Sequence, residues 1–342
     1  MDLNPSEEQQ QLIDAFSAFY AKECPTERVR AAEPSGHDAD LWALLREMGA
    51  LQMAVDESSG GWGASLLDLA LVAEQHGRYL GPAPLIEAVT AVRLLARAGG
   101  HPAAEVLSRA LTSDRLTTIA LLPPKNGVLG LVPAGAVADE VIFFEDGRLM
   151  CMEIADRGRS VSNIGSLPLA DIGIDAAAVV LASGSGAEPL FETARDEWLV
   201  LMANSLVGLG SRAMEIGVDY VKERHAFGVP IGSFQSVAHG LADAATAMDG
   251  SKLIAREAAW AAGEDAARAT ELACLSCGFS AESAREASYR SLHYHGGYGF
   301  MLEFDIQLYF RRAIAWPAVF GEPSQMFARG AAERLSSIRA DG

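Results

Sequence analysis

An arginine stands at the expected end of a helix in the segment Arg224–Gln235, which reads RHAFGVPIGSFQ. A guanidinium in that place, directly before a turn, can hold a phosphate group through two parallel hydrogen bonds. The alternative is that Arg224 is an ordinary surface residue, because most arginines face water. The segment therefore indicates a candidate phosphate contact.

A glycine pair follows a second long helical stretch further along the chain, in the segment His295–Phe300, which reads HGGYGF. Gly296 and Gly297 lack a Cβ, so the backbone there can adopt positive φ and its amides can approach a ligand closely. A simple helix C-cap is the alternative interpretation, since glycine often ends helices.

The elements that must position these residues are mostly helical. Residues 5 to about 112 show helical periodicity with a plausible N-cap at Ser6, interrupted by glycine-rich or proline-rich breaks at residues 58–63 and 81–84. Short β-prone runs follow, at residues 117–122, 140–144 and 178–182. Further helices are expected near 189–223, 231–262, 264–294 and 303–336.

This order predicts a mainly α fold with a small central β domain. We expect an N-terminal helical domain over residues 1–114, a short β-barrel-like module over 115–187 and a C-terminal helix bundle over 188–342. The alanine-rich stretch from Ala242 to Ala269 suits close packing in such a bundle.

The overall composition excludes several classes of protein. The chain has 342 residues, 50% of them hydrophobic, and its formal net charge is −18. That charge opposes nucleic-acid binding, which depends on Lys and Arg replacing counterions along the phosphate backbone, so any anion site must be a local concentration of positive charge. No signal-peptide pattern and no membrane-spanning run is recognisable, which indicates a cytoplasmic protein that binds no membrane.

Metal binding is disfavoured. Cys274 and Cys277 have the spacing of half a zinc site, but no second pair or nearby ligand histidine completes it, and a spacing of three also suits one face of a helix. Four cysteines in a chain of this length do not indicate a disulfide framework.

The two segments described first, together with the helix, sheet, helix order, resemble the acyl-CoA dehydrogenase family over nearly the whole chain. Residues 241–243 (LAD) extend the first match, and residues 60–63 (GGWG) and 71–74 (LVAE) fit it more loosely. The resemblance implies the acyl-CoA dehydrogenase fold, FAD as cofactor and an acyl-CoA thioester as substrate.

The resemblance also implies which residues contact FAD. Arg224 would grip the pyrophosphate, often across a subunit boundary, and Phe227 and Gln235 would contact the ADP half. Gly296 and Gly297 would hold the FAD of a neighbouring protomer.

The histidines near that glycine pair are less clearly placed by the resemblance. His293 stands where the family more often has a glutamine, so a polar FAD contact would persist there. For His293 and His295, a buried histidine bonded to a backbone carbonyl is the alternative.

The catalytic base is where the chain departs from the family pattern. Members abstract the α-proton of the thioester with a glutamate while a hydride leaves the β-carbon, so a carboxylate is indispensable. In the resemblance, Gly321 takes the position of that glutamate, and Glu322 is one residue away with Pro323 stiffening the turn.

Some relatives take the base from an earlier helix, at a position that falls here on Trp198. Glu197 is one residue off, which on a helix rotates the side chain by about 100°. Glu322 and Glu197 are therefore the two candidate bases, and for each the alternative is a solvated surface carboxylate.

The central module also departs from the pattern. The family's Thr-Glu-Pro-x-x-Gly-Ser-Asp loop is absent from residues 120–130 (ALLPPKNGVLG), and no Trp occurs between residues 63 and 197. These are the family's segments that cover the flavin ring and the thioester.

Taken together, the resemblance is to the small, degenerate subunit of actinobacterial heteromeric (α2β2) acyl-CoA dehydrogenases, which oxidise bulky, often steroid-derived acyl-CoAs; residues 303–312 (EFDIQLYFRR) carry it particularly. A larger acyl-CoA dehydrogenase subunit would then supply the base, and electron-transfer flavoprotein is a possible electron acceptor. Two alternatives stay open: a self-sufficient homo-oligomer that uses Glu322 or Glu197, and a non-catalytic scaffold subunit without FAD.

Overall fold

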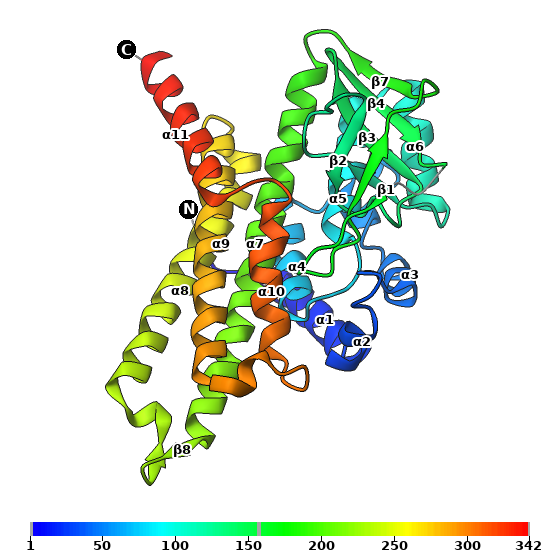
Figure 1. Ribbon diagram of the computed structural model, residues 1–342. Helices are drawn as coiled ribbons and strands as arrows, with labels where there is room; N and C mark the ends of the chain where they lie inside the picture. Colours follow the sequence, from blue (N-terminus) through cyan, green and yellow to red (C-terminus); the bar gives the residue numbers. More distant parts are fainter. Residues whose placement is uncertain (1–2, 156–158, 341–342) are drawn as a thin grey trace. The chain divides into compact units, whose positions relative to one another are not determined.

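The computed structural model describes residues 3–155 and 159–340, and in these ranges the chain is mainly helical with three small sheets (Figure 1). The helices before the sheets are α1 (Glu7–Glu23), α2 (Thr26–Ala31), α3 (Ala39–Glu47), α4 (Leu66–Arg78), α5 (Leu85–Ala98) and α6 (Gly100–Thr112). The strands that follow are β1 (Thr117–Ile119), β2 (Val128–Val132), β3 (Glu140–Glu145), β4 (Arg148–Glu153), β5 (Arg159–Ser160), β6 (Ala170–Gly173) and β7 (Val179–Ser183). The later helices are α7 (Ala187–Glu223), α8 (Gln235–Glu264), α9 (Ala269–Tyr294), α10 (Ile306–Ala318) and α11 (Pro323–Ala340), with a hairpin of β8 (His225–Ala226) and β9 (Val229–Pro230) between α7 and α8. Short 3-10 helices are η1 (Gln52–Ala54), η2 (Glu57–Ser59), η3 (Ile231–Ser233) and η4 (Gly296–Phe300).

The chain forms two compact units, which we name after their main elements. The bundle unit comprises Met1–Glu27, Ala70–Gly81 and Leu199–Gly342, and the sheet unit comprises Arg28–Leu69 and Pro82–Trp198. The predicted changes of secondary structure occur between Thr112 and Thr117 and between Ser183 and Ala187. The division into three domains stays a prediction.

The first helix begins where the sequence predicts. The Ser6 hydroxyl accepts the Gln9 N–H at 3.2 Å, and the Gln9 side-chain oxygen accepts the Ser6 N–H at 3.1 Å. This reciprocal capping box satisfies two backbone donors that a helix leaves unpaired. The predicted N-cap at Ser6 is confirmed.

The three predicted β-prone runs are confirmed as β1, β3 and β7. They join β4 in a sheet of order β1-β3-β4-β7, in which β1 and β3 are parallel and the other pairs antiparallel. A second sheet has the order β2-β6-β5. The apolar residues enclosed by this module are Ala120, Leu129, Val132, Val141, Phe143, Met150, Met152, Ala170 and Ile172.

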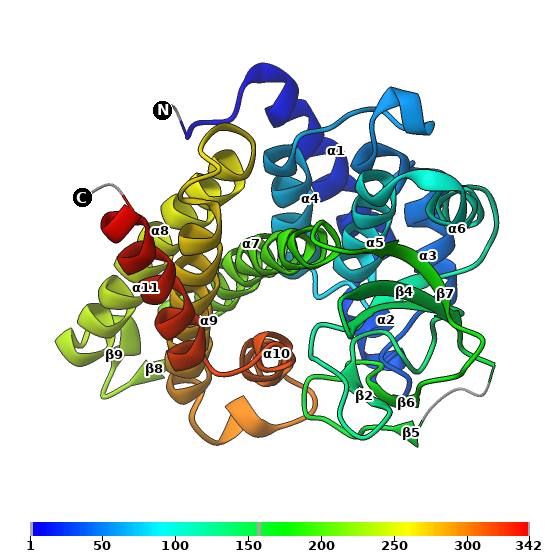
Figure 2. The same cartoon turned by 90° about the horizontal axis from the view of Figure 1, so that it is seen from above.

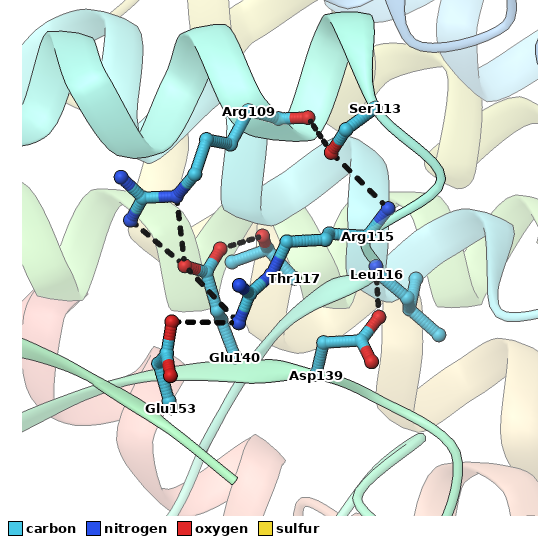
Figure 3. Close-up of polar contacts among 8 residues, drawn as sticks. All are labelled: Arg109, Ser113, Arg115, Leu116, Thr117, Asp139, Glu140 and Glu153. Carbon is cyan, nitrogen blue, oxygen red and sulfur yellow. Dashed lines mark hydrogen bonds and ion pairs between the residues drawn. The ribbon is translucent and has the colours of Figure 1, made fainter.

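A buried carboxylate anchors the module to α6 (Figure 3). Glu140, at the start of β3, is only 1% exposed; its carboxylate accepts hydrogen bonds from Arg109 Nη2 at 2.8 Å and from the Thr117 hydroxyl at 3.1 Å. Arg115 lies 2.9 Å from Glu153 on β4, and Asp139 accepts the Leu116 N–H at 2.8 Å. These bonds fix the connection between α6 and β1, because a buried carboxylate without partners would be strongly destabilising.

The bundle unit packs its long helices through small residues. α9 packs against both α8 and α11 (Figures 1 and 2), and the hydroxyls of Ser251 and Ser280 are 2.8 Å apart across the α8–α9 contact. A Cβ on Gly210 would overlap Met248, and one on Gly278 would overlap Phe327. Within the predicted alanine-rich stretch, five alanines of α8 are buried, as expected for close packing: Ala244, Ala255, Ala258, Ala259 and Ala261.

α7 is long and apolar enough to cross a membrane by length and composition. However, 72% of its most apolar window is buried inside the protein. This is the pattern of a core helix of a folded protein.

The predicted helix over residues 303–336 is wrong in one respect, because it is interrupted. α10 ends at Ala318 and α11 begins at Pro323. Gly321 between them has φ +147°, a conformation that residues with a side chain rarely adopt, and proline favours the first position of a helix.

Candidate functional site

One end of the bundle unit collects the residues that the sequence predicts to contact a cofactor. It comprises the end of α7, the β8–β9 hairpin, the start of α8, the end of α9 and η4 (Figure 1). On α7, Tyr220 stacks on His295 with ring centroids 3.9 Å apart, and on α8 a Cβ at Gly240 would meet the Tyr294 hydroxyl. We call this region the bundle end.

Arg224 directly follows the last residue of α7, as predicted, and is exposed. Its N–H donates to the Tyr220 carbonyl at 2.9 Å, and its carbonyl accepts the Ile231 N–H at 2.8 Å. The backbone of Arg224 is thus fixed by two bonds while its guanidinium faces outward.

Phe227 is at the tip of the β8–β9 hairpin and is 96% exposed. Phe227 and Gly228 both have positive φ, +53° and +83°. Two residues of positive φ form the type of two-residue turn that normally favours Asn-Gly. A fully exposed aromatic ring is therefore held on a strained backbone.

Gln235 is the first residue of α8 and is exposed. Among the described residues no side chain caps the α8 N-terminus, while the Val237 N–H already donates to the Phe234 carbonyl at 3.0 Å. Uncapped N–H groups at a helix start can bind an anion. Arg224 and Gln235 lie on either side of the β8–β9 hairpin and η3, and both stay candidate cofactor contacts.

Gly296 and Gly297 follow the end of α9 in η4. Gly296 has φ +60°, whereas Gly297 does not have positive φ. A Cβ on either residue would meet nothing within 4 Å. Backbone conformation therefore explains Gly296, but nothing inside the described chain requires glycine at 297, and the space beside it is open for a ligand or a second chain.

The two candidate histidines, His293 and His295, differ. His293 is exposed and stacks on Tyr289 with ring centroids 5.9 Å apart. His295 is buried, and its Nδ1 lies 2.7 Å from the Ser291 carbonyl. Burial lowers the pKa of His295 despite that contact. The backbone-bonded alternative thus describes His295, while His293 stays a candidate contact.

Glu322 is exposed, in line with the surface alternative. Its N–H donates to the Gln325 side-chain oxygen at 3.0 Å, which caps the start of α11. A Cβ on the neighbouring Gly321 would lie 2.5 Å from that same oxygen. A carboxylate at position 321 would therefore need both a different backbone and a displaced Gln325.

Glu197 is not a surface residue, so the surface alternative is wrong for it. It is 5% exposed and accepts hydrogen bonds from Arg93 at 2.8 and 3.1 Å and from Arg97. Burial alone would raise the pKa of Glu197, but the two guanidiniums outweigh it and hold the pKa below its usual value. Sequence reasoning missed this pairing, although two arginines four residues apart on α5 face the same way.

Trp198 is fully buried beside a second carboxyl that the sequence did not single out. Its Nε1 donates to Glu87 Oε1 on α5 at 3.3 Å. Burial raises the pKa of Glu87, so its neutral form is favoured more than for an exposed glutamate. No local signal in the sequence marks this contact.

The connection between β1 and β2 is short and closes tightly. Lys125 and Val128 exchange backbone hydrogen bonds of 2.9 and 3.1 Å, with Asn126 and Gly127 at positive φ between them. A compact turn thus occupies the segment where the sequence lacks the ring-covering loop.

Cys274 and Cys277 both lie on α9 and are buried as free thiols. Burial raises the pKa of the Cys277 thiol above its usual value. Within residues 3–155 and 159–340 no cluster of three or more histidine, cysteine or acidic side chains is placed to hold a metal ion.

Comparison with known proteins matches the chain along its length. Residues 6–105 match the acyl-CoA dehydrogenase N-terminal domain and residues 198–328 match the C-terminal domain. The chain is 30% identical over 334 residues to acyl-CoA dehydrogenase IpdE2 of Mycolicibacterium smegmatis, covering 96% of this chain and 99% of that protein. IpdE2 of Mycobacterium tuberculosis is 29% identical over 332 residues, 96% of this chain and 97% of that one.

Among solved structures, the ChsE4-ChsE5 complex from Mycobacterium tuberculosis contains a chain with a TM-score of 0.89. That chain is 24% identical, and the match covers 98% of this chain and 99% of the other. This similarity confirms the predicted fold class. With its two domain matches and a 30% identical relative of nearly equal length, the chain belongs to the acyl-CoA dehydrogenase family, whose members are FAD-dependent oxidoreductases acting on the CH–CH bond of acyl-CoA.

Proposed function

We propose that this chain is the FAD-binding subunit of a heteromeric acyl-CoA dehydrogenase that carries out α,β-dehydrogenation of an acyl-CoA. The observation that carries the proposal is a contrast between two sets of residues. The bundle end presents exposed phosphate donors, whereas neither candidate base is in place: Glu197 is held by Arg93 and Arg97, and Glu322 is one position away from the family's glutamate, where this chain has Gly321.

The reaction needs a hydride acceptor and a proton acceptor. FAD, when bound, accepts the hydride from the β-carbon of the thioester. This chain contributes to holding the cofactor: Arg224 and the first turn of α8 bind the pyrophosphate, and Gln235 and Phe227 contact the ADP half. Because Gly297 leaves open space, the backbone there can approach the dinucleotide of a neighbouring protomer.

The proton acceptor comes from a partner. A general base must be free to take a proton and must lie within hydrogen-bond reach of it. The carboxylate of Glu197 already accepts bonds from two arginines and its pKa is lowered, so it is a poor proton acceptor. Glu322 is exposed at the start of α11, one position away from the family's glutamate.

The partner is a larger acyl-CoA dehydrogenase subunit in an α2β2 assembly. Structural neighbours of this chain include the ChsE4-ChsE5 complex and a protein described as a steroid acyl-CoA dehydrogenase. We extend to this chain a heteromeric assembly and a bulky, steroid-like acyl group on the substrate. We further propose electron-transfer flavoprotein as the electron acceptor. We place the reaction in the cytoplasm.

The test is to purify the chain alone and together with a full-length acyl-CoA dehydrogenase of the same organism. We expect flavin absorbance and turnover in the complex and neither in the isolated chain. Arg224→Ala should release flavin from the complex, while Arg285→Ala, which removes an exposed arginine elsewhere on α9, should not. Strong flavin absorbance and turnover by the chain alone would refute the subunit assignment.

The same preparations separate the two rival functions. In a self-sufficient homo-oligomer, Glu322→Gln or Glu197→Gln would abolish exchange of the substrate α-proton with solvent. In a scaffold subunit without FAD, the complex would stay fully active after Arg224→Ala. Under our proposal both glutamine variants exchange the α-proton in the complex, and Arg224→Ala does not stay active.

A further inference from the structure

Two arginines on α5 share one carboxylate, and this leaves the sheet unit with a local excess of positive charge. Arg93 and Arg97 are four residues apart, so they lie on the same face of the helix, where like charges repel. Glu197 neutralises one of the two. The second charge remains although the side chains are only 17% and 29% exposed. Charges removed from water in this way are normally paired.

Arg97 makes fewer hydrogen bonds than Arg93. Each nitrogen of the Arg93 guanidinium makes a hydrogen bond: Nε and Nη2 donate to Glu197, and Nη1 donates to the Ala54 carbonyl at 3.2 Å. Arg97 donates to Glu197 through Nη2, and its Nη1 is buried with no hydrogen-bond partner among the described residues. A buried guanidinium nitrogen without an acceptor is costly, so an acceptor at this point would be stabilising.

A cleft of about 250 Å³ opens beside these side chains. Arg93, Ala96 and Arg97 form one wall, and the segment Ala54–Asp56 with Gly63 and Ala64 forms the other. The Gly63 N–H already donates to the Val55 carbonyl at 2.9 Å. Arg97 Nη1 is a donor that the cleft offers, because the long Arg97 side chain can turn it toward a bound group.

One acidic residue opposes them. Asp56 lines the opposite wall and is exposed, and no ion pair joins it to either arginine in the described residues. Its effect on a bound anion would be a screened repulsion, weaker than direct contact with a guanidinium. Neutralising Asp56 should therefore strengthen binding of an anion in the cleft.

We propose that this cleft, which we call the Arg97 cleft, binds a compact oxyanion, the carboxylate or phosphate group of a small molecule. This inference is independent of the proposed flavin-binding role, because every residue involved belongs to the sheet unit whereas the FAD contacts lie at the bundle end. The cleft volume suits a single small anionic group.

Isothermal titration calorimetry with sodium phosphate and sodium acetate at low ionic strength tests the proposal. The chain should carry Arg224→Ala throughout, so that the bundle end does not contribute. We expect saturable one-to-one binding of at least one of the two anions. The anion that binds identifies the group as phosphate or carboxylate.

Four variants in that background make the test specific. Arg97→Gln should weaken binding about tenfold, because it removes a charge-assisted hydrogen bond and leaves Arg93 on Glu197. Asp56→Asn should strengthen it severalfold. Arg159→Gln, which removes an exposed positive charge of the same unit, is the matched control and should leave affinity unchanged. Asp114→Asn, which removes an exposed negative charge outside the cleft, is the control for Asp56.

Several results would overturn the proposal. These are the absence of saturable binding by both anions, an equal loss in Arg97→Gln and Arg159→Gln, and an equal gain in Asp56→Asn and Asp114→Asn. If Arg97→Gln does not fold, the Asp56→Asn comparison still decides, because an exposed cleft wall tolerates that change.

Discussion

The carboxylate of Glu197 on α7 is held by Arg93 on α5 through two hydrogen bonds of 2.8 and 3.1 Å, in a place that is almost fully buried. The sequence presents the same glutamate as a candidate proton acceptor. The geometry instead gives it a structural role, because a carboxylate bonded in this way joins α5 to the first part of α7, which belongs to the sheet unit.

We therefore predict that Glu197→Gln lowers the free energy of unfolding by about 3 kcal/mol, because two guanidiniums then face each other without their shared carboxylate. Urea unfolding of the isolated chain measures this change. Glu322→Gln is the control, and as an exposed residue it should change stability by less than about 0.5 kcal/mol. Equal stabilities of the two variants would contradict the structural role of Glu197.

His76 gives the protein an acid-sensitive core. Its Nδ1 lies 2.8 Å from the Tyr20 hydroxyl, and burial lowers the pKa of His76 to about 4. The unfolded chain takes up this proton near the ordinary pKa of about 6.5, so between pH 6.5 and 4 the unfolded state binds more protons. Stability is complete above that window and should fall by about 3 kcal/mol across it as pH decreases.

Chemical unfolding at a series of pH values measures this slope. His76→Gln should flatten it between pH 6.5 and 4, even if the variant is less stable overall. His101→Gln, which changes a histidine whose side chain is 84% exposed, should keep the slope of the parent chain. A parent-like slope in His76→Gln would assign the acid sensitivity to other groups.

The two glycines of η4 should respond differently to alanine. Gly296→Ala should cost the isolated chain about 1 kcal/mol, because Gly296 has φ +60°. Gly297→Ala should be neutral or slightly stabilising, because its added Cβ meets nothing within 4 Å. In the complex with the partner, however, Gly297→Ala should reduce bound flavin. Thermal unfolding and the flavin absorbance of the complex measure the two effects, and an unchanged flavin content would remove Gly297 from the cofactor site.

The hairpin tip should show a conflict between stability and function. Phe227→Asn places a residue that tolerates positive φ at the first turn position, so the isolated chain should gain about 0.5 to 1 kcal/mol. The ring that is lost is 96% exposed and contributes little to the core. The same variant should weaken retention of FAD in the complex. A destabilised chain in urea unfolding would contradict the assignment of strain to this turn.

Local features of the fold could be predicted from the sequence because they depend on neighbouring residues. The capping box of Ser6 and Gln9 and the end of α7 before Arg224 are of this kind. The bundle end could be anticipated in part, since Arg224, Gln235 and Gly296 each lie next to a helix end, and helix packing then brings these ends together.

The remaining features depend on contacts between distant residues. Glu197 meets Arg93 across 104 positions and Trp198 meets Glu87 across 111, so neither pairing has a local signal. A helical register shows which way a side chain points but not what faces it. For the same reason the sequence left Glu197 among the exposed carboxylates. Helical periodicity continues on both sides of Gly321, so periodicity alone predicted one helix there and only the family resemblance indicated a turn.

The turn at Gly321 limits how this protein can change in evolution. With φ at +147° and the Gln325 oxygen occupying the space of a Cβ, a glutamate introduced there by mutation would meet an unfavourable backbone and an occupied neighbourhood at once. A single Gly321→Glu replacement would therefore place its carboxylate on a strained turn, and Gln325 would have to swing away to admit the new side chain.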